Sequence, residues 1–274
     1  MRCGRCGLVM LNPQPDDETL AAIYGETYFI GSDEDSLLEQ GNALKRGTAQ
    51  LQLAEISAYI GARVAADTHP HMLEVGCGLG NFLLEAHAAG FDVQGIDVST
   101  DAVATANAAL GEDRARAGML EEADFKAGQF DIIVLADVIE HVRNPKSFMQ
   151  YVRTLLKPSG VVFIAVPSLD SLSARLMGRY WVEFKREHLF YFNRQTICQL
   201  LKDCGFQDIT LSPGQKVLSL GYIIGHFKQF PVPLFTPALK VLERLLPRAP
   251  LSRPMQIVAS GLNALARVPP HPGK

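Results

Sequence analysis

The chain has 274 residues, of which 47% are hydrophobic and 20% are charged, and its formal net charge is −3. This length and composition are sufficient for one α/β domain with appendages and a full hydrophobic core. A slightly negative chain has no basic field that would attract a nucleic-acid backbone, so we do not expect DNA or RNA as a partner.

The sequence also argues against export and against a membrane span. The start, MRCGRCG, lacks the apolar segment of a signal peptide. Lys216, His226 and Lys228 interrupt the most apolar stretch, which is shorter than the roughly 20 residues of a transmembrane helix. The five cysteines do not resemble a secreted disulfide framework. We therefore expect a cytoplasmic protein.

Three regions can be distinguished along the chain. Residues 1–35 form an N-terminal appendage with a Cys-x-x-Cys pair, Cys3 and Cys6. Residues 36–212 form the main domain, and residues 213–274 form an amphipathic C-terminal region.

Helical and strand-like segments alternate through the main domain. Helices are predicted over residues 36–60, 81–90, 100–110 and 144–156, and strands over residues 71–76, 92–98, 130–137 and 161–166. This alternation is typical of an α/β fold with a doubly wound, mostly parallel sheet. Such a sheet binds its ligand outside the carboxyl ends of its strands.

The most informative segment, LEVGCGLGNF, follows the first of these strands. Its three glycines, Gly76, Gly78 and Gly80, occupy every second position and indicate a nucleotide-binding turn. A dinucleotide fingerprint would place its third glycine one residue later, where this chain has Asn81. Glu74 would in addition repel a pyrophosphate and attract a cation. The segment therefore disfavours a nicotinamide cofactor.

Further candidate residues follow the next strands. Asp97 ends the second strand, where a carboxylate can accept hydrogen bonds from ribose hydroxyls. Asp137 ends a later strand and is followed by Val-Ile-Glu-His, which ends at His141. Between them, Met119 and Leu120 follow a glycine at a place where an adenine ring could be held.

In combination, these motifs resemble those of the class I S-adenosylmethionine-dependent methyltransferases over roughly residues 70–212. The resemblance implies that S-adenosylmethionine is the cofactor. It implies that Glu74, Gly76, Gly78 and Gly80 border the methionine part, that Asp97 binds the ribose, and that Val98, Met119 and Leu120 flank the adenine. Cys77, inside the glycine motif, and Asp137 complete the expected cofactor-binding set.

The segment EHLFYFNRQTICQLLKDCGFQ, residues 187–207, is similar to one in small-molecule methyltransferases of the ubiquinone-biosynthesis-like group. RCGRCGLVMLNPQP, residues 2–15, resembles the second half of a zinc-ribbon-like piece found in many relatives. Structural zinc needs four ligands, usually two such pairs. Cys3 and Cys6 are therefore either part of a zinc site or two free thiols, and we assign no metal ligands.

The function expected from this resemblance is methyl transfer to a small molecule, with oxygen as the hypothetical acceptor atom. A hydroxyl acceptor requires a base, and His141 and His188 are the candidate catalytic residues, although either could have a structural role. The alternatives are a nicotinamide-dependent oxidoreductase and a non-catalytic protein that binds the cofactor or a partner.

Two groups of aromatic residues have open roles. Tyr24, Tyr28 and Phe29 either cover the cofactor or anchor the appendage. A second group lies after the last predicted strand of the main domain and either lines a substrate pocket or packs in the core: Trp181, Phe184 and Tyr191.

The C-terminal region contains an amphipathic pattern, with Leu234, Ala238, Leu242 and Leu245 on one helical face. We expect this face to be buried on the core or on a second copy, with peripheral membrane contact as the alternative. Residues 256–268 read as a last helix or a strand. The oligomeric state is left open.

Overall fold

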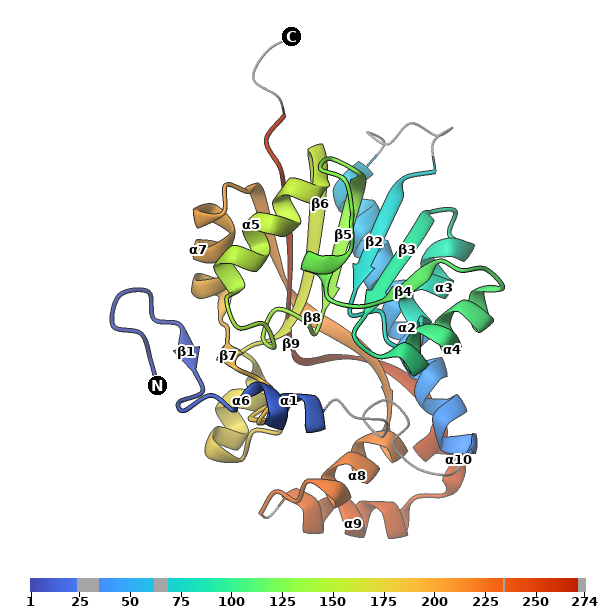
Figure 1. Cartoon of the computed structure of the whole chain (residues 1–274). Coiled ribbons are helices and arrows are strands. Elements are labelled where there is room, and N and C mark those ends of the chain that lie inside the picture. The colour runs from blue at the N-terminus through green and yellow to red at the C-terminus, as the bar shows by residue number, and fades with distance from the viewer. Residues whose placement is uncertain (24–34, 62–68, 234, 271–274) are drawn as a thin grey trace.

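A seven-stranded β-sheet with helices on both faces forms the centre of the protein (Figure 1). The computed structural model describes residues 1–23, 35–61, 69–233 and 235–270. Side by side, the strands lie in the order β4-β3-β2-β5-β6-β9-β8. They are β2 (His71–Val75), β3 (Asp92–Asp97), β4 (Ala115–Ala117), β5 (Phe130–Ala136), β6 (Leu156–Pro167), β8 (Gln207–Ser219) and β9 (Pro254–Arg267).

The five strands from β2 to β6 are parallel, as the alternation of elements predicted. The chain moves outward from β2 to β3 and β4 and then returns to the other side of β2 with β5, so the switch point lies between β2 and β5. The elements predicted between residues 36 and 166 are all present, and only β6 differs by more than two residues, because it begins at Leu156. The helices are α2 (Asp35–Ile60), α3 (Asn81–Ala88), α4 (Thr100–Leu110), α5 (Pro145–Leu155) and α7 (Arg194–Asp203).

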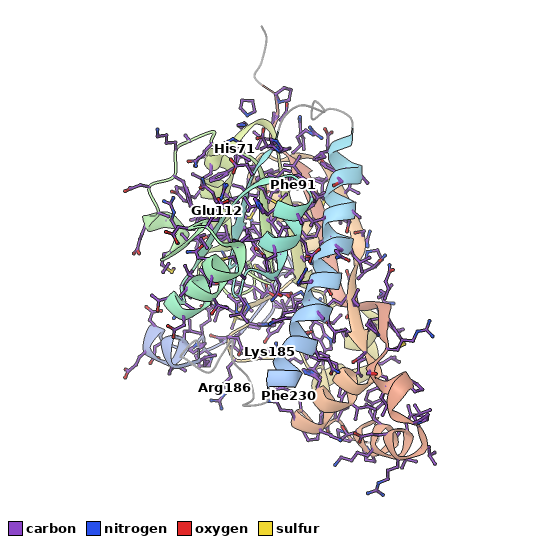
Figure 2. The ribbon with its side chains drawn as sticks, turned by 90° about the vertical axis from the view of Figure 1, so that its right-hand side faces the viewer. His71, Phe91, Glu112, Lys185, Arg186 and Phe230 are labelled. Carbon is purple, nitrogen blue, oxygen red and sulfur yellow. The ribbon has the colours of Figure 1, made fainter. Side chains whose placement is uncertain are left out.

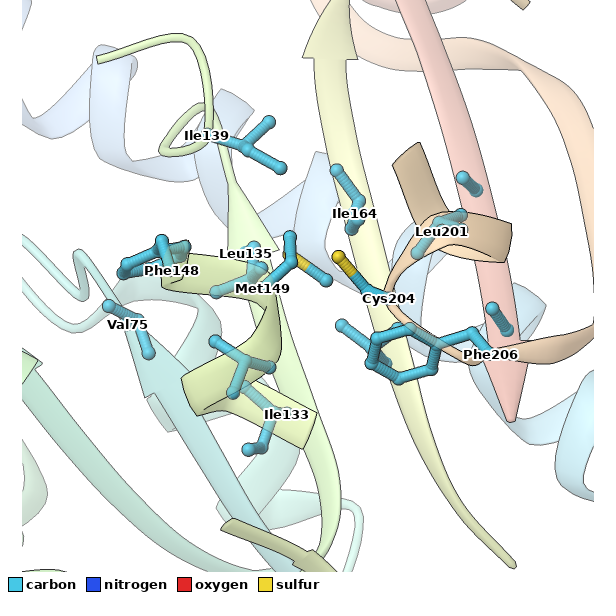
Figure 3. Packing of buried hydrophobic residues seen from close by; sticks show 14 of the residues in the cluster. Val75, Ile133, Leu135, Ile139, Phe148, Met149, Ile164, Leu201, Cys204 and Phe206 are labelled. Atoms are coloured by element: carbon cyan, nitrogen blue, oxygen red, sulfur yellow. The ribbon is translucent and has the colours of Figure 1, made fainter. Parts of the chain in front are cut away.

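Each face of the sheet has its own apolar cluster. On one face, Phe148 and Met149 of α5 pack with Leu135 of β5 and with side chains of α7 and of the segment directly after it (Figure 3). On the other face, α2, α3 and α4 cover the sheet, and Ile56 and Leu83 are fully buried there. Because both faces are covered, the central strands are almost continuously apolar.

The N-terminal appendage contacts the core at two places. Its strand β1 (Val9–Met10) pairs antiparallel with β7 (Phe190–Tyr191). Its helix α1 (Asp17–Ile23) is held by an ion pair in which Arg143 Nη2 lies 2.5 Å from Asp17 Oδ1. The appendage therefore lies beside the loop that follows β5.

The C-terminal region differs from the expected organisation. The boundary predicted at residue 212 falls inside β8, and β9 inserts between β6 and β8 as an antiparallel strand. Residues 256–268, expected as a helix or a strand, belong to this strand up to Arg267. The strands β6 and β8 thus both find their backbone hydrogen-bond partners in β9, a segment from the C-terminal part of the chain.

Among the described residues of this region, helices occur between β8 and β9: α8 (Leu220–Gln229), α9 (Phe235–Leu245) and α10 (Arg248–Ser252). We call residues 220–253 the cap, because these helices lie beyond the carboxyl ends of the parallel strands (Figure 1). Within the part of the chain that the structure describes, no helix has the length and apolar character needed to cross a bilayer.

Candidate functional site

The glycine loop after β2 has a backbone that suits glycine. Gly76, Gly78 and Gly80 have φ angles of +72°, +48° and +77°. A side chain at Gly76 would place its Cβ 2.8 Å from Val138 Cγ2, and one at Gly80 would place it 2.8 Å from Ala106 Cβ. The loop therefore needs glycine both for its turn and for close packing. Gly76 and Gly78 line a cavity of about 2570 Å³ at the switch point, whereas Gly80 packs against α4.

Asp97, at the end of β3, holds this loop with its carboxylate. Oδ2 accepts a hydrogen bond from Gly78 N–H at 2.8 Å, and Oδ1 accepts one from Ser99 N–H at 2.9 Å. An ionised carboxylate offers about four acceptor positions, so two remain for the hydroxyls of a ligand. Asp97 thus shapes the loop in addition to its expected contact with ribose.

Glu74 lies buried beneath the loop, and among the described residues its Oε2 has no hydrogen-bond partner. Burial, reinforced by the charge of Asp97, raises the pKa of Glu74 well above its usual value. A positively charged ligand beside the carboxyl would favour the ionised form. Glu74 lines the cavity, and its expected interaction with a cationic group stays a prediction.

The residues expected around an adenine ring also reach the cavity. Val98 and Met119 line it with exposed side chains, and Leu120 lines it with a buried one. Cys77 borders the cavity too, but its thiol is buried, and burial raises its pKa, so it remains protonated. Apart from Gly80, the cavity thus brings together the whole predicted cofactor-binding set.

Asp137 follows β5 with a φ of +54°, which is unusual for a residue other than glycine. Its Oδ2 lies 3.4 Å from Lys216 Nζ, which comes from β8. Burial acts to raise the pKa of Asp137, but Lys216 and Lys185 outweigh this effect and lower the pKa below its usual value. Asp137 is therefore a carboxylate that is held in place by a lysine.

Lys216 and Lys45, two of the three lysines that line the cavity, were not predicted from the sequence. Lys216 pairs with Asp137, whereas Lys45 of α2 has no carboxylate partner among the described residues. Burial and the charge of Lys216 lower the pKa of Lys45. Neither lysine belongs to a motif, so no local signal identifies them.

His141 and His188 form one wall of the same cavity. Their rings meet edge to face, with centroids 4.8 Å apart. His141 Nδ1 lies 3.0 Å from the carbonyl oxygen of Glu187, and because a carbonyl only accepts, Nδ1 carries the proton and Nε2 the lone pair. Burial lowers the pKa of both histidines, that of His188 to about 3. Both imidazoles are therefore neutral near pH 7.

Glu140 lies beside these histidines and is buried. Among the described residues, neither of its carboxyl oxygens nor His188 Nδ1 has a hydrogen-bond partner. One ligand atom each from Glu140, His141 and His188 lies within 4.8 Å of the others, an arrangement that could hold a metal ion. The sequence identified His141 and His188 separately as candidates, and the fold brings them together with Glu140.

Another part of the cavity wall comes from the segment before β7 and from the cap. Lys185 and Arg186 line it from that segment, and Phe230 lines it from the cap. Figure 2 shows these three residues at the end of the molecule opposite His71, the first residue of β2. This wall is on the side of the carboxyl ends of the strands.

The three aromatic residues of this segment have different roles. Phe184 is exposed and lines the cavity, whereas Trp181 and Tyr191 are buried. The ring of Phe184 meets those of Trp181 and Tyr191 edge to face, with centroids 5.3 Å and 5.1 Å apart. Trp181 and Tyr191 therefore pack and support the wall that Phe184 presents.

Other predicted features remain separate from the site. Tyr24, Tyr28 and Phe29 lie outside the described residues. Cys3 and Cys6 form no disulfide, and among the described residues no further His, Cys, Asp or Glu side chains join them in a set of metal ligands, so the choice between a zinc site and two free thiols stays open.

Comparison with known proteins places the chain in a family. A family model described as "Methyltransferase domain" matches residues 46–211, which is more than half of the chain. The chain is 34% identical over 122 residues to the ubiquinone biosynthesis O-methyltransferase of Caulobacter vibrioides, covering 40% of this chain and 47% of that protein. The chain thus spans about half the length of the curated relatives it matches.

Solved structures share the fold. An S-adenosylmethionine-dependent methyltransferase of Thermotoga maritima, described as a possible histamine N-methyltransferase, has a TM-score of 0.55 at 14% identity, covering 90% of this chain and 99% of that one. Phosphoethanolamine N-methyltransferase 2 of Haemonchus contortus, solved with S-adenosylhomocysteine, has a TM-score of 0.52 at 21% identity, covering 81% and 53%. The resemblance seen in the glycine, Asp97 and Glu-His motifs is confirmed: the chain belongs to the methyltransferase-domain family and has the fold of the S-adenosylmethionine-dependent methyltransferases.

Proposed function

We propose that the protein transfers the methyl group of S-adenosylmethionine to an oxygen atom of a small-molecule acceptor in the cytoplasm. The observation that carries this proposal is a single cavity shared by the glycine loop, Asp97 and two neutral imidazoles. Ligand pockets usually measure about 300–1,000 Å³. A cavity of about 2570 Å³ has room for the cofactor and an acceptor together.

In this proposal the loop and the strand ends hold the cofactor. Gly76, Cys77 and Gly78 contribute backbone, and the carboxylate of Asp97 accepts the ribose hydroxyls. The adenine lies against Val98, Met119 and Leu120. The methionine end carries an ammonium and a carboxylate, and the cavity offers Glu74 and Asp137 for the ammonium and Lys45 for the carboxylate.

The transfer is an in-line displacement. The bond from sulfur to the methyl carbon breaks, the bond from the acceptor oxygen to that carbon forms, and the electron pair stays on sulfur as a neutral thioether. Alignment of the two reacting atoms in one cavity supplies much of the acceleration. The proton of a hydroxyl acceptor goes to His141 Nε2, which carries the lone pair.

His188 has a different role from His141 in this scheme. A base works best when its pKa is near the working pH, and the pKa of His188 is about 3. We assign it to contact with the acceptor and to support of the His141 ring. Two of the curated relatives, from Caulobacter vibrioides and Methylococcus capsulatus, are named ubiquinone biosynthesis O-methyltransferases, which supports oxygen as the acceptor atom. The net charge of −3 supports a small molecule over nucleic acid as the substrate.

The first test is calorimetric titration of the purified protein with S-adenosylmethionine, S-adenosylhomocysteine and NADH in one buffer. Binding of the two sulfur nucleotides without NADH binding is expected. Binding of NADH alone would overturn the proposal and favour a dehydrogenase. Binding of the sulfur nucleotides with no transfer to any acceptor would favour the non-catalytic alternative.

The second test concerns the base. His141→Gln should lower turnover with phenolic and alcohol acceptors more than tenfold while leaving the affinity for S-adenosylhomocysteine nearly unchanged. Because burial lowers the pKa of His141 below 6.5, the acid limb of the wild-type kcat/KM profile should lie below pH 6.5. Unchanged turnover in this variant would show that His141 is not the base and has a structural role.

A further inference from the structure

A lysine that the proposed reaction has not used lies near the two histidines of the cavity. Lys185 comes three residues before His188, lines the cavity, and has a side chain that is 38% exposed. Burial is the main cause of the lowered pKa values of His141 and His188, and the charge of Lys185 acts to lower both further. Both rings are thus within range of this charge. The cavity therefore places a cation near the base of the proposed reaction.

The backbone at Lys185 is fixed by its neighbours. The buried residue Tyr191 of β7 donates a hydrogen bond from its hydroxyl to the carbonyl oxygen of Lys185 at 3.1 Å. Two residues after Lys185, the carbonyl oxygen of Glu187 accepts the Nδ1 proton of His141 at 3.0 Å. The segment that carries the lysine is therefore tied both to β7 and to His141, which keeps the charge of Lys185 in the neighbourhood of the base.

The ammonium of Lys185 keeps its hydrogen-bond donors available for a ligand. Glu183 Oε2 lies 3.8 Å from Lys185 Nζ, which is too long for a hydrogen bond. The other oxygen of Glu183, Oε1, accepts a hydrogen bond from Ser260 Oγ at 2.6 Å and is held in place by it. Glu183 thus restrains the lysine by charge alone. Within the described chain, the three N–H donors of Lys185 Nζ are unused.

The other basic side chains that the described residues bring to the cavity are already engaged or screened. Lys216 and Arg143 are each paired with an aspartate. Arg186 is exposed, so solvent and salt screen its charge. Lys45 is assigned above to the carboxylate of the methionine end. Lys185 is therefore the cation that remains for the acceptor.

The titratable groups around Lys185 come from several elements. Asp137, after β5, has its pKa lowered by Lys216 and by Lys185, which together outweigh the effect of burial, so it is ionised at neutral pH. His226, from α8 of the cap, has its pKa lowered by burial and also by Lys185, so it is neutral near pH 7. Asp137 is already held by Lys216, and neither group supplies a positive charge to the acceptor.

A cation is needed there because an imidazole is a weak base for a hydroxyl group. An imidazole has an ordinary pKa of about 6.5 and a phenol one of about 10, so proton transfer between them favours the reactants by about 3,000-fold. An opposite charge within about 4–6 Å lowers the pKa of an acid by about 1–3 pH units. A lysine beside the oxygen that loses the proton therefore makes the transfer to His141 about 10- to 1,000-fold more favourable.

We propose that Lys185 is a catalytic residue that binds the acceptor oxygen as an oxyanion, an inference that rests on the proposed function. The acceptor hydroxyl gives its proton to His141 Nε2 and keeps the electron pair, and Lys185 Nζ donates a hydrogen bond to the charged oxygen. This electron pair then forms the bond to the methyl carbon while the bond from that carbon to sulfur breaks and its electron pair stays on sulfur. Lys185 keeps its three protons throughout.

The test measures the pKa of 4-nitrophenol bound to the full chain that is saturated with S-adenosylhomocysteine. The ionised phenol absorbs at a longer wavelength than the neutral one, so absorbance against pH gives this pKa. Wild type should lower it by about 1–3 pH units relative to the free phenol. Lys185→Met should remove most of the decrease and bind the phenolate at least about tenfold more weakly, whereas Lys185→Arg should keep most of it.

A matched control for this variant is Lys228→Met. It removes a lysine that pairs with a glutamate outside the cavity, since Lys228 Nζ lies 2.7 Å from Glu243 Oε1. It should change the affinity for the phenolate by less than about twofold, because a surface ion pair contributes little and does not face the acceptor.

Binding of S-adenosylhomocysteine, measured on every variant, separates the role of Lys185 from the proposed function. Lys185→Met should keep this affinity, because the lysine contacts the acceptor and not the nucleotide. A wild type that binds the nucleotide but leaves the pKa of the phenol unchanged, or does not bind the phenol, overturns the role of Lys185 and leaves the proposed function intact. An equal decrease of this pKa in wild type and Lys185→Met also overturns it, as does a loss of nucleotide affinity in Lys185→Met. A wild type that binds no nucleotide contradicts the proposed function itself.

Discussion

Lys216 Nζ lies 3.4 Å from Asp137 Oδ2, so an ion pair links the edge strand β8 to the carboxyl end of β5 in the middle of the sheet. Asp137 has a φ of +54°, a conformation that costs roughly 1–3 kcal/mol and persists only where the surroundings impose it. Lys216 is therefore a positioning residue for a carboxylate of the proposed cofactor site.

Lys216→Met should weaken binding of S-adenosylhomocysteine by about tenfold, because Asp137 loses the group that orients it. The free energy of unfolding should fall by only about 1 kcal/mol or less, since the pair is partly exposed. Lys216→Arg should keep most of the affinity. Calorimetric titration and thermal unfolding check both expectations.

A matched control for this variant is Lys157→Met. It removes an ion pair with Asp131, in which Lys157 Nζ lies 2.7 Å from Oδ2, away from the cavity. It should leave nucleotide affinity unchanged. Equal affinities of wild type and Lys216→Met for S-adenosylhomocysteine would show that Lys216 has no positioning role in the site.

Asp97→Asn should reduce the affinity for S-adenosylhomocysteine more than about 100-fold. An amide has one acceptor oxygen, so it cannot hold both Gly78 N–H and Ser99 N–H, and its NH₂ group would face one of these donors. The unmade hydrogen bond should also lower stability by about 1–3 kcal/mol. The exposed residue Asp101 provides the control, because Asp101→Asn should change neither the nucleotide affinity nor the conformation of the loop. An unaltered affinity in Asp97→Asn would contradict the proposed ribose contact.

Gly80→Ala separates backbone strain from steric crowding when it is compared with Gly111→Ala. Both glycines have left-handed φ angles, +77° and +72°, so both substitutions impose strain of roughly 1–2 kcal/mol. Only at Gly80 would the new Cβ meet a neighbour, Ala106 Cβ at 2.8 Å. Gly80→Ala should therefore destabilise more, and it alone should weaken nucleotide binding. Equal losses of stability in urea unfolding would show that the loop tolerates a side chain.

Much of this site could be predicted because its signals are local. The glycine loop and Asp97 follow consecutive parallel strands, and the carboxyl ends of such strands meet at one edge of the sheet. The spacing of glycines and the apolar runs of β2 and β3 were sufficient to place these residues together. Local sequence determines such a site because neighbouring elements along the chain are also neighbours in space.

Other parts depend on contacts that no local pattern encodes. Lys216 reaches Asp137 from 79 residues away, and β9 pairs with β8 across the whole cap. For α9, periodicity predicted an apolar strip but not its partner. The helix buries Leu239 against α8, and this choice is set by the shape of the cap and not by the pattern of α9 itself.

The stability of the Glu140→Gln variant, compared with that of the wild type at the same pH, should increase as pH rises. Burial, reinforced by the charge of Asp137, raises the pKa of Glu140 above 4.5, so between 4.5 and the raised pKa the folded protein keeps a proton that the unfolded chain releases. Stability contributed by this group is therefore present below pH 4.5 and is lost as pH rises, by at most about 1.4 kcal/mol per pH unit. The neutral amide of Gln cannot release a proton, so the variant avoids this loss. Urea unfolding at pH 4.5, 6 and 8 should show a stability difference between variant and wild type that grows with pH. The control Glu121→Gln, at an exposed site, should show a constant difference. A constant difference for Glu140→Gln would mean that Glu140 is ionised in the folded protein.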